Sequence, residues 1–281
     1  MQARQRLPDD LAACRGLSVT AKPFRSARVG GCLHADIEQR ADGCQILRST
    51  EPLAPYPERL SDCLSHWAQL APDRLFVAQR DPAVSGGGDW VGISYAQMLA
   101  RAKAVGQALV DRGLSAQQPV LILSDNDLEH LSLAMGAMWA GVPYVPVSPS
   151  YSLLSQDFGK LRHIVKQVTP GLVFAASPAY ARAIQAVIDP ALEVVMGRGE
   201  IAGRATTPFD DLLRTTPAPT LELAHAATSA ETIVKFLFTS GSTKLPKGVI
   251  TTHRMLCANQ QMLRQAFAFL GDEPPVLVDW L

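Results

Sequence analysis

Residues 236–248 read Phe-Leu-Phe-Thr-Ser-Gly-Ser-Thr-Lys-Leu-Pro-Lys-Gly. Hydroxyl side chains lie on both sides of Gly241, and Lys247 follows a few residues later. Hydroxyls, exposed backbone N–H groups and a cation are the groups that surround a bound polyphosphate in proteins. An apolar run, Ile233–Phe238, precedes the stretch, and Gly248–Thr251 has the pattern of a second strand. We therefore expect a loop that joins two strands and is suited to phosphate groups.

This loop differs from the two best-known phosphate-binding loops. A Walker A loop has the form G-x-x-x-x-G-K-[ST] and leads from a strand into a helix. Here Lys247 precedes Gly248, and a strand-like segment follows. A Rossmann G-x-G-x-x-G is also absent from this region. The alternative is an ordinary hairpin loop rich in Ser, Thr and Gly. This alternative is disfavoured because an ordinary loop would not be expected to combine the hydroxyl cluster and Gly241 with Pro246, Lys247 and Gly248 in this order.

The composition of the chain limits the classes of protein to which it can belong. Its 281 residues are enough for one large domain or two ordinary ones, and its 47% hydrophobic content supports a sizeable core. The formal net charge of zero argues against a general nucleic-acid-binding protein, which normally carries a basic excess. The five cysteines form no CxxC pair and the six histidines have no ligand spacing. We therefore expect reduced thiols and no zinc site.

The sequence has no pattern of a secretion signal or of a membrane anchor. Its first ten residues are polar and mixed in charge, without an apolar segment. No run approaches the roughly 18 consecutive apolar residues that a membrane-spanning helix needs. We therefore expect a cytoplasmic protein without a membrane span.

The hydrophobic pattern predicts helices that alternate with short apolar strands. Helices are expected near 60–71, 94–112, 126–140, 155–169, 177–188 and from 253 onward, and strands near 76–78, 120–123, 142–147, 172–175, 193–196 and on both sides of the loop. This alternation predicts an α/β fold with mixed, largely parallel sheets flanked by helices. Residues 1–55 have no regular pattern, and residues 197–230 have the composition of a polar surface connection.

Local signals mark the starts of two of these helices. Ser94 with Gln97 and Asn126 with Glu129 both have the spacing of a capping box. The segment Asp125–Asp127 has acidic residues that would suit a metal ion. Its place between a strand and a helix favours a capping role instead.

Two other segments have a functional and a structural interpretation. The glycines of Ser85–Asp89 would suit a phosphate, but no periodic helix follows them, so a flexible hairpin tip is favoured. Met135, Met138 and Trp139 form a stripe with Leu128 and Leu131 at helical spacing. This stripe is typical of a buried helix face rather than of a ligand site.

The segment Thr239–Gly248 is similar to the phosphate-binding signature of the adenylate-forming acyl-CoA synthetases, the AMP-binding superfamily. The usual form of that signature is T-S-G-[ST]-[ST]-G-x-P-K-G. The segment Ala140–Pro146 agrees with the same family. Residues 147–153 and 252–256 most resemble its feruloyl-CoA synthetase branch. The resemblance covers about residues 55–281.

This resemblance implies a two-step reaction. A carboxylate attacks the α-phosphate of ATP to give an acyl adenylate and pyrophosphate, and the thiol of coenzyme A then displaces AMP. Mg²⁺ normally assists the first step. The expected partner is a small carboxylic acid, with an aromatic acid such as ferulate favoured, and no nucleic acid is expected. The oligomeric state is left open.

The resemblance also assigns the residues that bind the phosphates. They are Thr239, Ser240, Gly241, Ser242, Thr243, Lys247 and Gly248. Hydroxyl and backbone N–H groups donate to the β- and γ-phosphates, Gly241 lets the backbone approach closely, and Lys247 supplies a cation. Gly248 relieves crowding where the next strand begins. No catalytic or metal-binding residue is assigned.

Three further residues, Lys244, Thr252 and His253, lie in or near the loop. Thr252 and His253 lie one short strand away and are expected to border the nucleotide or acyl pocket. For His253, a capping or packing role at a helix start is an equal alternative. Lys244 stands where the family often has glycine. It either strains the backbone, if that position needs a positive φ, or adds a second cation near the phosphates.

The resemblance stops before several parts that the family needs. Its acid pocket, its ribose-binding acidic residue, its hinge and the C-terminal domain with the catalytic lysine come later in such enzymes. We therefore expect an N-terminal extension at 1–55 and a partial AMP-binding domain at 56–281, inactive or nearly so by itself. The alternatives are a catalytically inactive remnant or nucleotide-binding module, and a different adenylating enzyme such as a peptide-synthetase adenylation domain or a luciferase-like protein.

Overall fold

The computed structural model describes residues 27–30, 34–80, 88–239 and 245–278. Its largest feature is a seven-stranded sheet in the order β11-β10-β6-β5-β7-β8-β9. The strands are β5 Val120–Leu123, β6 Tyr144–Pro146, β7 Leu172–Ala175, β8 Val194–Met196, β9 Thr207–Pro208, β10 Ile233–Thr239 and β11 Lys247–Thr252. Neighbouring strands pair in parallel from β10 to β9, whereas β11 is antiparallel to β10. The predicted mixed, largely parallel sheet is confirmed.

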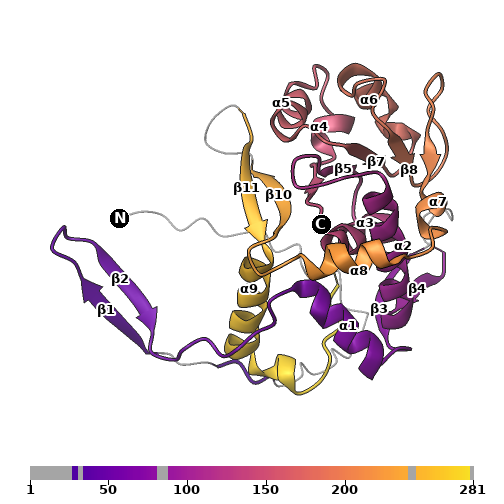
Figure 1. The fold of residues 1–281 in the computed structure, drawn as a ribbon. Coiled ribbons are helices and arrows are strands. Elements are labelled where there is room, and N and C mark those ends of the chain that lie inside the picture. Colours follow the sequence, from indigo (N-terminus) through magenta and orange to yellow (C-terminus); the bar gives the residue numbers. More distant parts are fainter. Residues whose placement is uncertain (1–26, 31–33, 81–87, 240–244, 279–281) are drawn as a thin grey trace, which may run out of the picture.

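Helices cover both faces of this sheet (Figure 1). On one side lie α2 Tyr95–Asp111, α3 Leu128–Ala140 and, outside them, α8 Pro219–Ala226. On the other side lie α4 Ser150–Leu153, α5 Gly159–Val168 and α6 Ala181–Val187, which follows the 3-10 turn η2 Pro178–Tyr180. Strands β5, β7 and β8 are buried along their whole length, as parallel strands between two helical layers must be. None of the helices in the described residues is long and apolar enough to span a bilayer.

A smaller hydrophobic cluster joins the first helix to the sheet's helical layer. Helix α1 Leu60–Leu70 packs here with the antiparallel pair β3 Leu75–Arg80 and β4 Trp90–Ser94. The buried residues of this cluster are Leu64, Ile93, Met98 and Ala102. The predicted capping box at the start of α2 is confirmed, because the Ser94 hydroxyl and the Gln97 side chain each bond the other residue's backbone N–H. The glycine-rich tip between β3 and β4 falls largely on residues 81–87, outside the described residues.

Helix α3 differs from its prediction in two ways. Its N-cap is Asp127 rather than Asn126, because the Asp127 carboxylate accepts from His130 N–H. A carboxylate at this position also interacts favourably with the positive end of the helix dipole. The helix is buried on more than the predicted face, since Leu133 and Ala137 are as inaccessible as Met138. The reason is its position between the sheet and the smaller cluster.

The segment 197–230 was predicted to be a surface connection, and this prediction is wrong. It contains β9, the short helix α7 Phe209–Leu213 and α8. Phe209, Leu212 and Leu221 are fully or almost fully buried. Few apolar residues separated by polar ones give no clear period, so the pattern did not reveal elements this short.

Two further predictions are corrected in the middle of the chain. The helix expected from Ser155 begins at Gly159, because the Ser155 hydroxyl instead accepts from Phe158 N–H in a turn before the helix, at 3.0 Å. The expected strand 142–147 shortens to three residues, and its register with β10 is limited to one pair, Lys235 with Tyr144. The proline at 146 has no N–H to donate, which is consistent with this short pairing.

The chain before the first hairpin lies beside the end of α9 His253–Ala266. Helix α9 and this hairpin are seen in Figure 1. The irregular pattern of residues 1–55 gave no indication of two strands within that segment. Strands β1 Ala35–Gln39 and β2 Gln45–Ser49 form an antiparallel hairpin that extends away from the body. A 3-10 turn, η3 Ala268–Gly271, follows α9. Gly30 N–H donates to the carbonyl of Ala266 at 3.0 Å and so joins the chain before the hairpin to the end of α9.

Candidate functional site

The phosphate-loop candidate is the connection between β10 and β11. The two strands pair antiparallel, and their last registered pair is Thr239 opposite Lys247. The predicted strand-to-strand setting of the loop is confirmed. Residues 240–244, which include Ser240, Gly241, Ser242 and Thr243, lie outside the described residues. Thr239 and Lys247 therefore mark the two sides of the loop's base, and both are exposed.

One face of this hairpin is aromatic and turned toward the core. Phe236 and Phe238 alternate on β10, and both pack against the main hydrophobic cluster. Gly248 is registered opposite Phe238. A Cβ at Gly248 would lie 3.3 Å from the Phe238 ring, closer than most such contacts. The absence of a side chain at Gly248 thus leaves room for the ring at the start of β11.

The opposite face of the hairpin carries one lysine at each end, with the apolar pair Leu237 and Val249 between them. Alternation along β10 puts Lys235 on the same face as Thr239. Lys247 lies on this face too, because it is the partner of Thr239 in the neighbouring strand. Lys235 is partly buried, and this burial lowers the pKa of its ammonium group. The sequence interpretation did not include Lys235. Its position four residues before Thr239, an even spacing that puts both residues on one face of a strand, is the signal that would have identified it.

A histidine from α5 contacts Pro246, the residue that leads from the loop into β11. The Nε2 atom of His163 lies 3.1 Å from the carbonyl oxygen of Pro246, so the ring N–H donates to that carbonyl. Pro246 is buried, whereas the next residue, Lys247, is exposed. The position of Lys247 is therefore fixed on one side by an element 83 residues away in sequence. No local pattern in the sequence could have indicated this contact.

His253 lies at the other end of β11, as the first residue of α9. Thr252 caps the helix by accepting from Met255 N–H. The His253 side chain is fully buried, and its Nδ1 accepts from Leu60 N–H at 3.2 Å. Its Nε2 has no hydrogen-bond partner among the described residues. Burial, followed by the positive charge of Arg59, lowers the pKa of His253 to about 4.

The geometry of His253 therefore shows a packing residue that joins α9 to α1. Whether its free Nε2 also borders a nucleotide is not tested by these contacts, so that role stays a prediction. Thr252 is buried as well, and its hydroxyl is engaged in the helix cap.

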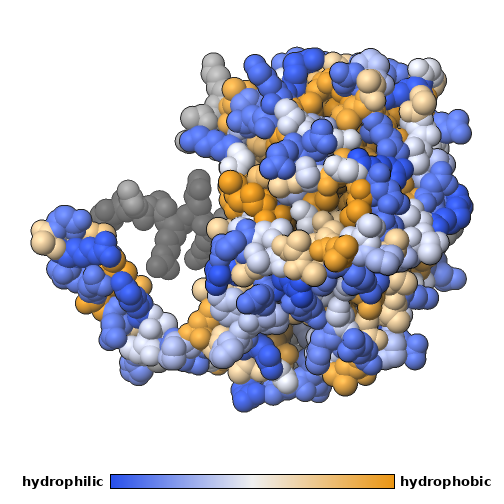
Figure 2. Space-filling model, viewed as in Figure 1, coloured by the Kyte–Doolittle hydropathy of each residue, from blue (hydrophilic) through white to orange (hydrophobic). Residues whose placement is uncertain are grey.

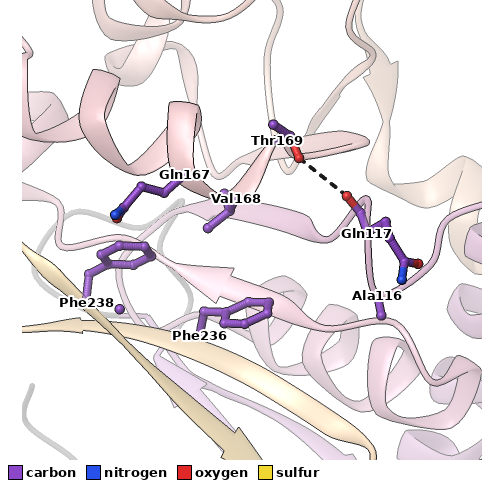
Figure 3. Close-up of a pocket in the computed structure, with 8 residues that line it drawn as sticks. Ala116, Gln117, Gln167, Val168, Thr169, Phe236 and Phe238 are labelled. Carbon is purple, nitrogen blue, oxygen red and sulfur yellow. Dashed lines mark hydrogen bonds between the residues drawn. The ribbon is translucent and has the colours of Figure 1, made fainter.

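A groove of about 480 Å³ lies on the aromatic face of the hairpin. Its lining consists of Ala116, Gln117, Gln167, Val168, Thr169, Phe236, Phe238 and Gly248. Figure 3 shows the two phenylalanine rings opposite the end of α5, with the Thr169 hydroxyl directed to the Gln117 carbonyl at 3.4 Å. None of these lining residues is charged. The groove is thus suited to apolar groups, and the cations of the hairpin lie on its other face.

The acidic segment after β5 has the capping role that the sequence favoured. The Asp127 carboxylate accepts from His130 N–H at 2.6 Å, and burial raises the pKa of Asp127 to about 6. Burial also lowers the pKa of His130, whose Nδ1 lies 2.9 Å from the Ser124 hydroxyl. No group of three or more metal-binding side chains occurs in the part of the chain that the structure describes.

Comparison with known proteins identifies the family. The profile of the AMP-binding enzymes matches residues 64–278, from within α1 to beyond η3. The chain belongs to the AMP-binding enzyme family. The segment of this AMP-binding enzyme that matches the profile contains both strands β10 and β11.

Relatives of this AMP-binding enzyme include peptide synthetases and ligases. It is 27% identical over 218 residues to a probable non-canonical nonribosomal peptide synthetase of Salinispora arenicola, a match that covers 77% of this chain and 2% of the relative. It is 26% identical to a long-chain-fatty-acid–AMP ligase of Mycobacterium tuberculosis, and this match covers 80% of this chain and 36% of the ligase. It is 27% identical to a 4-hydroxyphenylalkanoate adenylyltransferase of Mycobacterium marinum, and this match covers 79% of this chain and 34% of that relative. The chain thus spans little more than a third of the ligases, and far less of the synthetase.

Solved structures agree with the fold. A fatty acyl-adenylate ligase from Legionella pneumophila, solved with acyl adenylate and pyrophosphate, has a TM-score of 0.55 and 21% identity. The match covers 75% of this chain and 33% of that one. The fold is therefore that of part of an adenylate-forming enzyme. These relatives do not single out the feruloyl-CoA synthetase branch.

Proposed function

We propose that the β10–β11 hairpin of this chain binds the triphosphate of ATP in an adenylate-forming ligase. The observation that carries the proposal is the pairing of Thr239 with Lys247 at the base of the loop. This pairing sets a hydroxyl and a cation side by side, on the face of the hairpin that lies away from the aromatic groove. Ser240, Gly241, Ser242 and Thr243 complete the phosphate contacts in this proposal.

The reaction begins when a carboxylate oxygen attacks the α-phosphorus of ATP. One P–O bond forms to the acid while the bond to pyrophosphate breaks, which gives the acyl adenylate. Two anions must approach each other, so the protein contributes mainly charge neutralisation and position. Lys247 offsets charge on the β- and γ-phosphates, where the leaving group gains negative charge. Mg²⁺ arrives with the nucleotide, because this ion is commonly held by substrate phosphates.

We assign the acid to the aromatic class, with ferulate as the example, and coenzyme A as the acceptor of the acyl group. Residues 147–153 and 252–256 support this assignment through their resemblance to feruloyl-CoA synthetases. The name of the 4-hydroxyphenylalkanoate relative is also consistent with an aromatic acid. The fatty-acid–AMP ligase relative favours the competing class, a long-chain fatty acid.

Nucleotide binding by this chain tests the role of the hairpin. Titration calorimetry with ATP and Mg²⁺ should show that Lys247→Ala weakens binding roughly 10- to 100-fold, the equivalent of one lost charge-assisted hydrogen bond. Lys244→Ala should weaken it less. Lys166→Ala, an exposed lysine on α5, is the matched control and should leave the affinity unchanged. Equal losses for Lys247→Ala and Lys244→Ala would refute the assigned ranking, and unchanged binding in both would refute the site.

ATP–pyrophosphate exchange tests the substrate class. It is measured with ferulate, benzoate and a long-chain fatty acid, for the protein that contains this chain. Exchange that depends on ferulate or benzoate supports the aromatic assignment. Exchange with the fatty acid alone would replace it, without affecting the proposal for the hairpin.

A further inference from the structure

The β1–β2 hairpin is an arm that the AMP-binding family profile does not include, since the match begins at residue 64. Figure 1 shows the hairpin extending away from the rest of the molecule. An isolated two-stranded hairpin is at best marginally stable in water, and stable forms usually add further strands or pack on another surface. The arm therefore has an open face that none of the described residues covers.

The base of the arm is held firmly on α9. Arg28 forms an ion pair with Asp272, and Phe269 N–H donates to the Arg28 carbonyl at 3.1 Å. On the other side of the hairpin, Ala54 N–H donates to the Gln265 side chain at 2.8 Å. Both ends of the arm are thus joined to the same helix and its following turn. A pre-positioned arm loses less conformational entropy on binding than a free segment does.

One face of the arm is charged. The cross-strand register places Asp36 opposite Arg48 and Glu38 opposite Ile46 on this face. Arg48 forms an ion pair with Glu38 at 2.9 Å. Charged groups that already pair with each other in water gain little from a further contact. This face is suited to solvent.

The other face is uncharged along its whole length. It consists of Ala35, Ile37, Gln39, Gln45, Leu47 and Ser49. Ile37 and Leu47 are directly opposite each other at its centre, and they remain 63% and 67% exposed. Figure 2 shows hydrophobic patches on the otherwise hydrophilic arm. Two large aliphatic side chains between amides form an apolar centre with a neutral polar rim.

We propose that this neutral face docks on the same face of a second copy of the chain. A two-fold contact brings each surface against itself, so it must place no like charges opposite each other. The neutral face meets this condition because it carries no charge, and Ile37 of one copy can lie against Leu47 of the other. A contact between two hairpin faces is small, and interfaces below about 1,200 Å² are typical of transient complexes. The dimer is therefore weak and concentration-dependent.

Sedimentation velocity over a range of concentrations tests the contact. The wild-type chain should shift from monomer to dimer as its concentration rises. The variant Ile37→Asp with Leu47→Asp, and the variant Ile37→Lys with Leu47→Lys, should each weaken the dimer at least about tenfold, because charge is buried against like charge. Asp36→Ser on the charged face is the matched control and should leave the dimer unchanged. Far-UV circular dichroism of each variant shows whether its fold is kept.

Mixing the two charged variants gives the decisive result. If the neutral faces meet, the lysine and aspartate variants should form a one-to-one dimer together although neither associates alone. Failure of the mixture to associate overturns the proposal. A wild-type chain that stays monomeric at all concentrations also overturns it. Association that the Asp and Lys variants leave intact, but that Met262→Lys removes, assigns the contact to exposed residues of α9 instead.

Discussion

The buried histidine at the start of α9 makes the stability of the fold sensitive to acid. Burial lowers the pKa of His253 from 6.5 to about 4 in the folded chain. The unfolded chain therefore binds the proton more readily between these values, and stability is lost as the pH falls below about 6.5. Burial also lowers the pKa of the neighbouring His225, which acts in the same direction. Asp127 acts in the opposite direction, because its raised pKa favours the folded state below about 6.

We expect His253 to account for a loss on the order of 3 kcal/mol between pH 6.5 and 4, at about 1.4 kcal/mol per pH unit. The variant His253→Asn keeps a side-chain acceptor for Leu60 N–H but cannot take up a proton. Its free energy of unfolding in urea should therefore vary less with pH over this window than that of the wild type. If the wild type and the variant had parallel pH profiles, the pKa of His253 would be the same in the folded and the unfolded chain, which contradicts its lowering by burial.

His163 is expected to position the phosphate loop rather than to contact a ligand. Replacing it with alanine removes the donor to the Pro246 carbonyl, a hydrogen bond worth about 1 kcal/mol. ATP affinity should fall roughly fivefold, and His163→Gln, which keeps an N–H donor, should recover part of the loss. The melting temperature separates this effect from general destabilisation. An affinity for ATP that is unchanged in His163→Ala would contradict the positioning role.

At the scale of residues, the sequence points to candidates where the signal is local. Lys247 is a predicted phosphate-binding residue because it follows Pro246 and precedes Gly248, as in the family signature. His163 could not be identified in this way, since its contact with Pro246 exists only after α5 packs beside the hairpin. Lys235 falls between these cases, because its shared face with Thr239 follows from the alternation of a strand.

At the scale of elements, helices α2 and α3 cross at a close approach. A Cβ added at Gly136 would lie 2.6 Å from Val105 Cγ1 and 2.9 Å from the backbone nitrogen of Gly106. The Val105 side chain can move only slightly in a filled core, and the Gly106 backbone cannot move without shifting α2.

Gly136→Ala should therefore destabilise the fold by about 1–3 kcal/mol, the usual cost of overpacking, despite alanine's better helix propensity. Urea unfolding measures this change. Gly271→Ala is the matched control, because nothing lies within 4 Å of a Cβ there, and it should change stability by less than about 0.5 kcal/mol. A Gly136→Ala variant as stable as this control would show that the helices separate easily.

The elements that sequence predicted best are a long helix with a clear period and two strands made of consecutive apolar residues. Helix α2 and the buried strands β5 and β7 were found nearly at their observed bounds. Helix α7 was missed because five residues are too few to show a helical period. The burial of α3 on several sides depends on which elements lie around it, and this information is tertiary.

At the scale of the whole molecule, the two hydrophobic clusters share helices α2 and α3. The main cluster contains Leu133 of α3, and the smaller cluster contains Met98 of α2. Met135, also on α3, packs against both. Loss of either cluster would expose part of α3, so the two parts stabilise each other. We therefore expect them to unfold together rather than in separate steps.

This coupling is tested with one substitution in each cluster. Leu133→Ala and Met98→Ala should each cost about 2–5 kcal/mol, since both side chains are fully buried. Each should lower the same unfolding midpoint, whether it is followed by far-UV circular dichroism or by tryptophan fluorescence. Trp67 and Trp90 belong to elements of the smaller cluster, so their fluorescence reports on that part. If Met98→Ala shifts the fluorescence transition but not the circular dichroism transition, the smaller cluster unfolds on its own, and α3 does not couple the two parts.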